Sequence, residues 1–203
     1  MNNAAAHNQK KMSWQLLAIL AVSIIPIVAA YIAYYTGWGV PQDTVNEGVL
    51  LQPAKNVADL LTEAEGDKPQ FADNLQWRLL IPVPADCDKG CQQNLYITRQ
   101  VHIRLAEKGD RVERYAVNLG GAAGEDFLRS IQAEHPGLKH FSVPPKTWER
   151  WLAGSNVPNN FTGDHYYLLV DQVGFAMMYY SLQHDGNQLL KDLKRVLRHS
   201  PGG

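Results

Sequence analysis

The residues with the clearest chemistry are the two cysteines of the chain, which stand four positions apart at Cys87 and Cys91. Two thiols can form one disulfide, act as one redox dithiol or supply two thiolates to a metal ion. If both residues were helical, their Cβ atoms would lie about 5 to 6 Å apart, whereas a disulfide needs about 4 Å. The loop would then have to move to close a bridge. A wide, adjustable pair suits thiol–disulfide exchange and also Cu(I), a soft ion that takes thiolate and imidazole ligands.

The alternative to a working pair is an inert disulfide that braces the domain. A bridge from Cys87 to Cys91 encloses only three residues. In the chain-entropy treatment of disulfides, such small loops give the least stabilisation. The spacing therefore favours a functional pair.

A third ligand for a metal at the cysteines would come from a histidine elsewhere in the chain. His165 follows Asp164 just before an expected strand, and His140 lies in an expected surface loop. On the residues alone, each is most simply an ordinary polar loop residue. His102 stands eleven positions after Cys91, about 16 Å along a helix axis, which is too far to share a metal. The other histidines lie in expected turns or tails and are given no role.

The cysteines follow a short apolar run, residues 75–83, whose flanking turn signals indicate a buried parallel strand. After them, residues 91–108 have apolar side chains at helical spacing, and residues 111–119 alternate in the manner of a second strand. Strand, cysteine loop, helix and strand together predict a parallel crossover unit. The cysteines would then lie close together and accessible at the carboxyl end of a strand, where α/β sheets place ligands and reactive groups, and burial of either one would count against the proposed activity.

Further elements are expected in the rest of the chain after residue 36, and the final helix has the clearest pattern of all. Residues 37–74 are expected to form a linker and an irregular domain edge, with a polar loop over 63–74, and residues 75–203 the domain itself. The further elements expected within this domain are helices over 125–134 and 144–153, a hairpin of strands over 166–171 and 175–180, and a final helix with one apolar face over 189–197.

An uncharged apolar segment, residues 14–36, precedes the domain. It is long enough to cross about 30 Å of hydrocarbon and predicts a transmembrane helix. Lys10 and Lys11 precede it and no Lys or Arg follows until Lys55, so the positive-inside bias predicts that residues 1–13 are a cytoplasmic tail. The domain would then be periplasmic, or otherwise extracytoplasmic, on a single-pass protein of the inner (cytoplasmic) membrane. A cleaved signal peptide is the alternative, but the apolar run is longer than a typical signal core.

The charge of the chain gives no sign of a nucleic-acid partner. Charged residues make up 19% of the sequence and the formal net charge is -1. A protein that binds nucleic acid through its overall field would carry a clear excess of positive charge. Nucleic-acid binding is therefore not expected.

Chain plan and motif together resemble the Sco/SenC family, membrane-anchored proteins of cytochrome c oxidase assembly. The copper site of that family is a C-x3-C pair plus a later histidine in an Asp-His pair just before a strand. The matching residues here are Cys87 and Cys91, and Asp164-His165 ahead of residues 166–171. The resemblance implies an α/β, thioredoxin-like domain with one N-terminal transmembrane helix.

The resemblance also implies that Cys87 and Cys91 are the reactive residues and that His165 joins them as a ligand of Cu(I). The chain would deliver copper, or reduce the thiols of the oxidase copper site, with a cytochrome c oxidase subunit or another membrane complex as its partner. Two other functions stay open. The chain could be a general periplasmic thiol–disulfide oxidoreductase, with Cys87 as nucleophile and Cys91 as resolving thiol. It could also be a non-enzymatic interaction protein that assists assembly.

Overall fold

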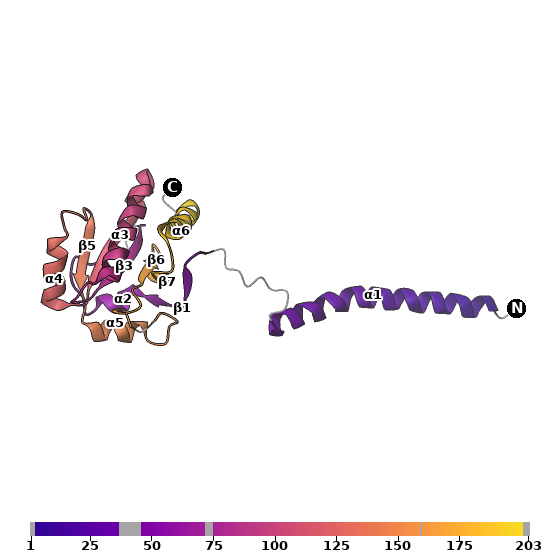
Figure 1. Cartoon of the computed structure of the whole chain (residues 1–203). Coiled ribbons are helices and arrows are strands. Elements are labelled where there is room, and N and C mark those ends of the chain that lie inside the picture. Colours follow the sequence, from indigo (N-terminus) through magenta and orange to yellow (C-terminus); the bar gives the residue numbers. More distant parts are fainter. Residues whose placement is uncertain (1–2, 37–45, 72–74, 159, 201–203) are drawn as a thin grey trace. The chain divides into compact units, whose positions relative to one another are not determined.

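The computed structural model describes residues 3–36, 46–71, 75–158 and 160–200. The chain divides into two compact units, Met1–Val45 and Asn46–Gly203 (Figure 1). The first contains one helix, and the second contains the sheet that carries the cysteines.

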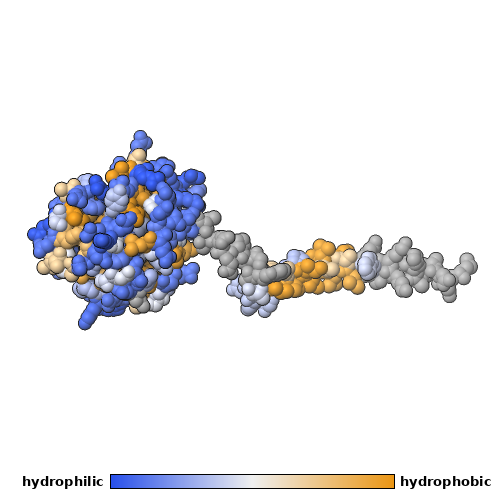
Figure 2. Space-filling view, in the orientation of Figure 1, coloured by the Kyte–Doolittle hydropathy of each residue, from blue (hydrophilic) through white to orange (hydrophobic). Residues whose placement is uncertain are grey.

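The helix of the first unit, α1, runs from Asn3 to Thr36 and has Pro26 inside it. Its segment Leu16–Thr36 is long and apolar enough to cross a membrane, since 21 residues at helical rise cover about 30 Å. Figure 2 shows the apolar residues gathered along this helix. The predicted apolar helix is therefore present, and it extends further toward the N-terminus than the expected residues 14–36.

The second unit is built on a seven-stranded sheet of order β1-β7-β6-β3-β4-β5-β2. The strands are β1 (Val49–Asn56), β2 (Glu65–Gly66), β3 (Trp77–Val83), β4 (Val112–Asn118), β5 (Leu138–Ser142), β6 (Tyr167–Val170) and β7 (Phe175–Tyr180). β3, β4 and β5 are parallel neighbours, and the remaining pairings are antiparallel. Every residue of β3 is buried, as a central strand covered on both faces requires.

The predicted crossover unit is confirmed. β3 is followed by the cysteine loop, by helix α3 (Lys89–Arg104) with the 3₁₀ turn η1 (Ala106–Arg111), and then by β4, which pairs parallel to β3. α3 begins at Lys89 because the side chain of Asp88 caps it, accepting hydrogen bonds from the backbone of Gly90 and Cys91. The expected hairpin is also present as β6 and β7.

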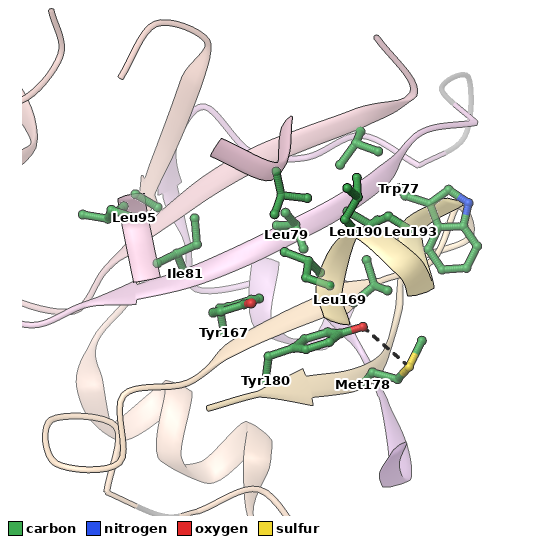
Figure 3. Packing of buried hydrophobic residues seen from close by; sticks show 14 of the residues in the cluster. Trp77, Leu79, Ile81, Leu95, Tyr167, Leu169, Met178, Tyr180, Leu190 and Leu193 are labelled. Atoms are coloured by element: carbon green, nitrogen blue, oxygen red, sulfur yellow. Dashed lines mark hydrogen bonds between the residues drawn. The ribbon is translucent and has the colours of Figure 1, made fainter. Parts of the chain in front are cut away.

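Helices cover both faces of the sheet, and the side chains of neighbouring β3 residues pack on opposite faces. The other helices are α2 (Val57–Leu61), α4 (Gly121–Ser130), α5 (Pro145–Leu152) and α6 (Gly186–His199). Leu79 and Ile81 belong to an apolar cluster that includes residues of α3, α4 and α6, drawn in part in Figure 3. Leu80 belongs to a second cluster that includes Leu60 of α2 and Trp148 of α5. The cysteines lie in the first of these clusters.

Helix α4, Gly121–Ser130, begins and ends four residues earlier than the helix expected over 125–134. Three further segments differ from expectation, all at or near the sheet edges. Residues 48–61, expected to be irregular, form β1 and α2, and the expected loop after them contains β2. β5 was not predicted at all. In β5 only Phe141 is buried, so its side chains show no apolar run, and the strand is held by backbone pairing with Arg114–Asn118. Backbone pairing leaves no pattern in the sequence.

Candidate functional site

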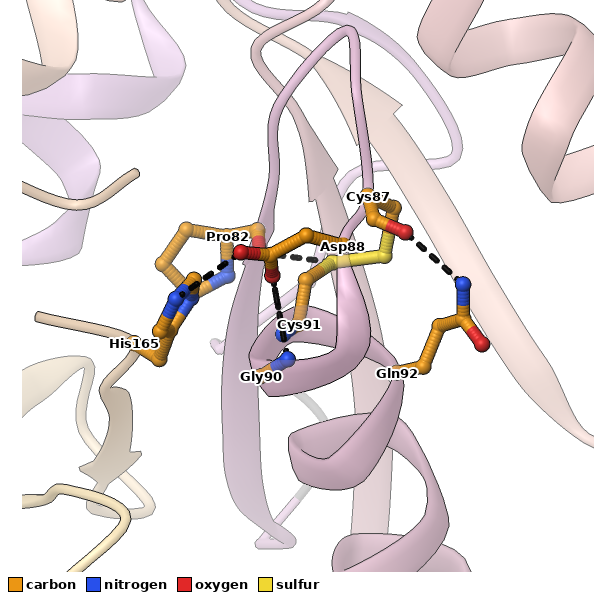
Figure 4. Close-up of a disulfide and its surroundings, with 7 residues drawn as sticks. All are labelled: Pro82, Cys87, Asp88, Gly90, Cys91, Gln92 and His165. Atoms are coloured by element: carbon orange, nitrogen blue, oxygen red, sulfur yellow. Dashed lines mark hydrogen bonds and ion pairs between the residues drawn. A yellow bond between two sulfur atoms is a disulfide. The ribbon is translucent and has the colours of Figure 1, made fainter. Parts of the chain in front are cut away.

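The cysteines are joined in a disulfide just beyond the carboxyl end of β3 (Figure 4). Cys91 lies in the first turn of α3, whereas Cys87 precedes the cap residue and is not helical. The Cα–Cα distance is 5.2 Å, which is within the range that disulfides accept. The expectation that a wide pair must move to close was therefore wrong, because it assumed two helical residues.

Both cysteines are buried, whereas we expected them to be accessible. Cys87 is 7% exposed and Cys91 2% exposed, and the Cys91 sulfur lies 4.0 Å from the carbonyl oxygen of Pro82. They pack with Val83 and Leu95 in the apolar cluster under α3. In this disulfide form, a reagent or partner thiol can reach the sulfurs only after local opening of the loop.

Two side chains hold the loop around the disulfide. Asp88 accepts hydrogen bonds from the backbone N–H groups of Gly90 and Cys91 at 3.0 and 3.1 Å. The Gln92 side chain donates to the carbonyl oxygen of Cys87 at 2.8 Å. The loop is thus tied to the first turn of α3 from both sides of the disulfide.

His165, from the segment that leads into β6, reaches this loop. Its Nε2 lies 3.2 Å from Asp88 Oδ2, and its side chain is only 11% exposed. The imidazole also packs on Gly90, because a Cβ built on that glycine would lie 2.3 Å from His165 Cδ2. His165 has a backbone φ of +41°, in the left-handed region that few non-glycine residues adopt. The structure therefore brings His165 to the cysteine loop, where the resemblance placed it.

The other candidate histidines have different partners. His140 lies on β5, not in a loop, and its Nε2 is 3.2 Å from Glu125 Oε1 on α4. His102 lies on α3 with Nε2 2.9 Å from the carbonyl oxygen of Val112. Neither of these contacts includes a residue of the cysteine loop.

Cys87, Cys91 and His165 could hold a soft metal only after the disulfide is reduced. Within the described residues, no group of three or more His, Cys, Asp or Glu side chains is arranged to hold a metal ion. The sulfurs are bonded to each other, and a metal binds the thiolate form of cysteine. Reduction would supply two thiolates at the two ends of the loop that His165 contacts, a sulfur and nitrogen set that suits Cu(I).

Four roles in the loop were not anticipated from the sequence. Asp88 is both a helix cap and the partner of His165, and Gln92 binds the Cys87 carbonyl. An aspartate just before a helix is a recognisable cap signal, so the first role could have been found. The need for glycine at Gly90 could not have been found from the sequence, because it depends on contact with His165 from another part of the chain.

A parallel crossover unit with a disulfide after its first strand, extended by an antiparallel hairpin and a final helix, defines a thioredoxin-like domain. The chain belongs to the family described as transmembrane-like, thioredoxin-like, C-terminal domain, whose model matches residues 77–200. A search of curated proteins finds no match to this sequence.

Solved structures with a similar fold include Sco proteins. One is BsSco, a member of the Sco family of cytochrome c oxidase assembly proteins in which a disulfide switch was identified. It has 13% identity and a TM-score of 0.51, over 77% of this chain and 96% of that chain. A putative electron transfer protein from Aquifex aeolicus VF5 has 12% identity and a TM-score of 0.50. The match covers 78% of this chain and 94% of that chain.

A third similar structure is Arabidopsis thaliana ScoI with copper bound, at 12% identity and a TM-score of 0.47, over 62% of this chain and 86% of that chain. Identities this low show a shared fold. The expected α/β, thioredoxin-like domain with one apolar N-terminal helix is confirmed, and the resemblance to Sco proteins holds for the fold of a divergent sequence.

Proposed function

We propose that this chain is a membrane-anchored, Sco-like factor of cytochrome c oxidase assembly that binds and delivers Cu(I) through Cys87, Cys91 and His165. The observation that carries the proposal is the contact of His165 with the loop between the cysteines. Its imidazole packs on Gly90 and its Nε2 is 3.2 Å from Asp88. The packing of His165 on the loop between the cysteines supports its proposed role as a third ligand after reduction of the disulfide.

Copper binding requires a reductant. An external dithiol gives two electrons and two protons to the Cys87–Cys91 disulfide, which becomes two thiols while the reductant closes its own disulfide. The thiols lose their protons when they bind metal. Asp88 would hold the imidazole of His165 through Nε2, as carboxylates commonly hold metal-binding histidines.

The proposed client and location rest on the fold and the first helix. BsSco, which shares the fold, is a member of a family of cytochrome c oxidase assembly proteins. Lys10 and Lys11 before the apolar segment favour a cytoplasmic N-terminus. With residues 14–36 as a transmembrane helix, the domain would work on the outer side of the inner membrane, next to a membrane-bound client.

The test is a Cu(I) titration of the reduced full chain in detergent, against a competing chelator. The wild type is expected to bind one Cu(I), Cys87→Ser and Cys91→Ser to lose that binding, and His165→Ala to weaken it by about tenfold or more. His140→Ala is the matched control and should bind as the wild type does. No binding by the wild type, or unchanged binding by both cysteine variants, would overturn the proposal.

A second candidate function is thiol–disulfide exchange, which the closed disulfide favours. The Cys87 thiolate would attack a client disulfide, form a mixed disulfide and expel one client thiolate. Cys91 would then attack the Cys87 sulfur, release the second client thiolate and close the observed bridge. Cys87 is the less buried of the two cysteines, which fits its role as nucleophile.

The reduction potential of the pair separates this function from a structural bridge. Equilibration of the full chain with thiol redox buffers should give a potential above about -300 mV, below which structural disulfides lie. A potential deep in the structural range would exclude the exchange reaction. If a double Cys→Ser variant fully supported oxidase assembly in cells, the chain would act instead as a non-enzymatic assembly protein.

A further inference from the structure

A cleft of about 630 Å³ lies between α3 and α4. One wall contains Tyr96 and Arg99 of α3, and the other contains Phe127 of α4 with Ile131 and His135 just after it. Lys89 and Gln92 line its other end, near the disulfide loop. Lys89 and Arg99 are ten residues apart on one helix, so the cleft extends about 15 Å along α3.

A buried arginine lies behind the His135 end of this cleft. Arg114, on β4, is 2% exposed. Its Nη2 donates to the carbonyl oxygen of Leu95 at 3.1 Å and lies 3.3 Å from Nδ1 of His135 and 3.4 Å from Oγ1 of Thr98. All of these partners are neutral acceptors, and Arg114 Nε has no hydrogen-bond partner within the described part of the chain.

A second arginine adds to this positive charge. Arg99 lines the cleft itself, and its Nε is buried without a hydrogen-bond partner in the described residues. Burial and the charge of Arg99 lower the pKa of Arg114 to about 10. Burial, and then the charges of Arg114 and Arg99, lower the pKa of His135, and Glu134 opposes this effect. Buried cations are normally matched by a nearby negative charge.

We propose that this cleft binds a small organic acid, with its carboxylate or phosphate at Arg99 and His135, in front of the buried charge of Arg114, and its apolar part along Tyr96 and Phe127. Guanidinium groups recognise such oxyanions through paired, charge-assisted hydrogen bonds. Glu134 also lines the cleft and acts on His135, but no ion pair within the described residues joins it to Arg99 or Arg114, and the bound anion supplies that charge. The apolar walls add contact area, as is usual in small-molecule sites. This site is independent of the copper chemistry proposed for the disulfide loop.

The test uses the full chain in detergent, in the disulfide form, with NMR as the site-specific readout. Phenylacetate, phenylacetamide and inorganic phosphate are titrated separately at constant ionic strength. Phenylacetate should shift the signals of Arg99 and His135 saturably and bind about tenfold more tightly than the neutral amide. Equal binding of acid and amide, or no saturable shift with phenylacetate, would overturn the proposal. Phosphate that binds as tightly as phenylacetate would overturn the role of the apolar walls.

Two arginine variants complete the test. Arg99→Gln should weaken phenylacetate binding by about tenfold, since it removes a charge that contacts the anion. Arg129→Gln is the matched control, because Arg129 is an exposed arginine of α4 that pairs with Asp126 at 2.8 Å and does not line this cleft. It should bind as the wild type does. Wild-type affinity in Arg99→Gln, or an equal loss in both variants, would contradict the assignment.

Discussion

His165 and Gly90 are in such close contact that the glycine has no room for a side chain. A Cβ on Gly90 would lie 2.3 Å from Cδ2 and 2.7 Å from Nε2 of the imidazole. The two residues come from different elements, Gly90 from the first turn of α3 and His165 from the approach to β6. The position of the imidazole beside the cysteines therefore depends on the missing side chain at Gly90.

Gly90→Ala should displace His165 from the cysteine loop. The added methyl group must push the imidazole away. Overfilling a packed site typically lowers the unfolding free energy by about 1 to 3 kcal/mol, and we expect a loss of this size here. We expect Cu(I) affinity to fall about as far as in His165→Ala, measured by competitive titration. Lys89→Ala, an exposed neighbour in the same loop, should keep wild-type affinity. If Gly90→Ala bound Cu(I) normally, His165 would not be a ligand.

Asp88 has two roles that two substitutions can separate. Asp88→Ala removes the helix cap and should lower the unfolding free energy by about 1 kcal/mol, whereas Asp88→Asn keeps a capping oxygen and should cost much less. Both variants remove the charge beside His165 and should weaken Cu(I) binding. Asp185→Ala, which removes the cap of α6, should destabilise the fold similarly and leave Cu(I) affinity unchanged. Denaturant unfolding and Cu(I) titration of all three variants make the comparison.

Reduction of the disulfide should leave the domain folded. The loop closed by Cys87 and Cys91 is very short, and the chain-entropy treatment gives a bridge of this size about 2 kcal/mol of stabilisation. Both apolar clusters of the domain remain available without it. Denaturant unfolding with and without a reductant should therefore show a modest shift of the midpoint. Complete unfolding on reduction would assign the bridge a structural role.

His135 should make the domain less stable in mild acid. Burial, Arg114 and Arg99 hold its pKa in the folded protein below the ordinary value of 6.5. The unfolded chain therefore binds this proton more readily, and the unfolding free energy falls as the pH drops through about 6.5, by at most about 1.4 kcal/mol per pH unit. Unfolding curves between about pH 7 and pH 5 should show this slope in the wild type and a smaller one in His135→Gln. Parallel pH profiles for the two proteins would contradict the assignment.

The sequence predicted the elements whose burial leaves a pattern. β3 is an uninterrupted buried strand, and α6 places Leu189 and Leu193 on one buried face, so both were recognisable. β1 and β5 were missed because they lie near the sheet edges and are held by backbone pairing, with several exposed or partly exposed side chains.

The limits of prediction are clearest at the candidate site. The C-x3-C pair and the Asp-His pair were visible as motifs, and the structure brings Cys87, Cys91 and His165 to one loop. The burial of the cysteines and the contact with Gly90 arise from packing between distant segments, which one sequence does not reveal. His135 was assigned to a turn without a role, and only the structure places it against buried Arg114.

Because both cysteines are buried, the rate at which the loop opens should limit reactions at the disulfide. A thiol that attacks the disulfide must wait until the loop opens, so its rate of reaction should stop rising with thiol concentration once loop opening is rate-limiting. A partner that opens the loop by docking beside it would not be limited by the rate of spontaneous loop opening. The closed loop would thus protect the disulfide from reduction by small thiols in solution and make its reduction selective for a specific electron donor.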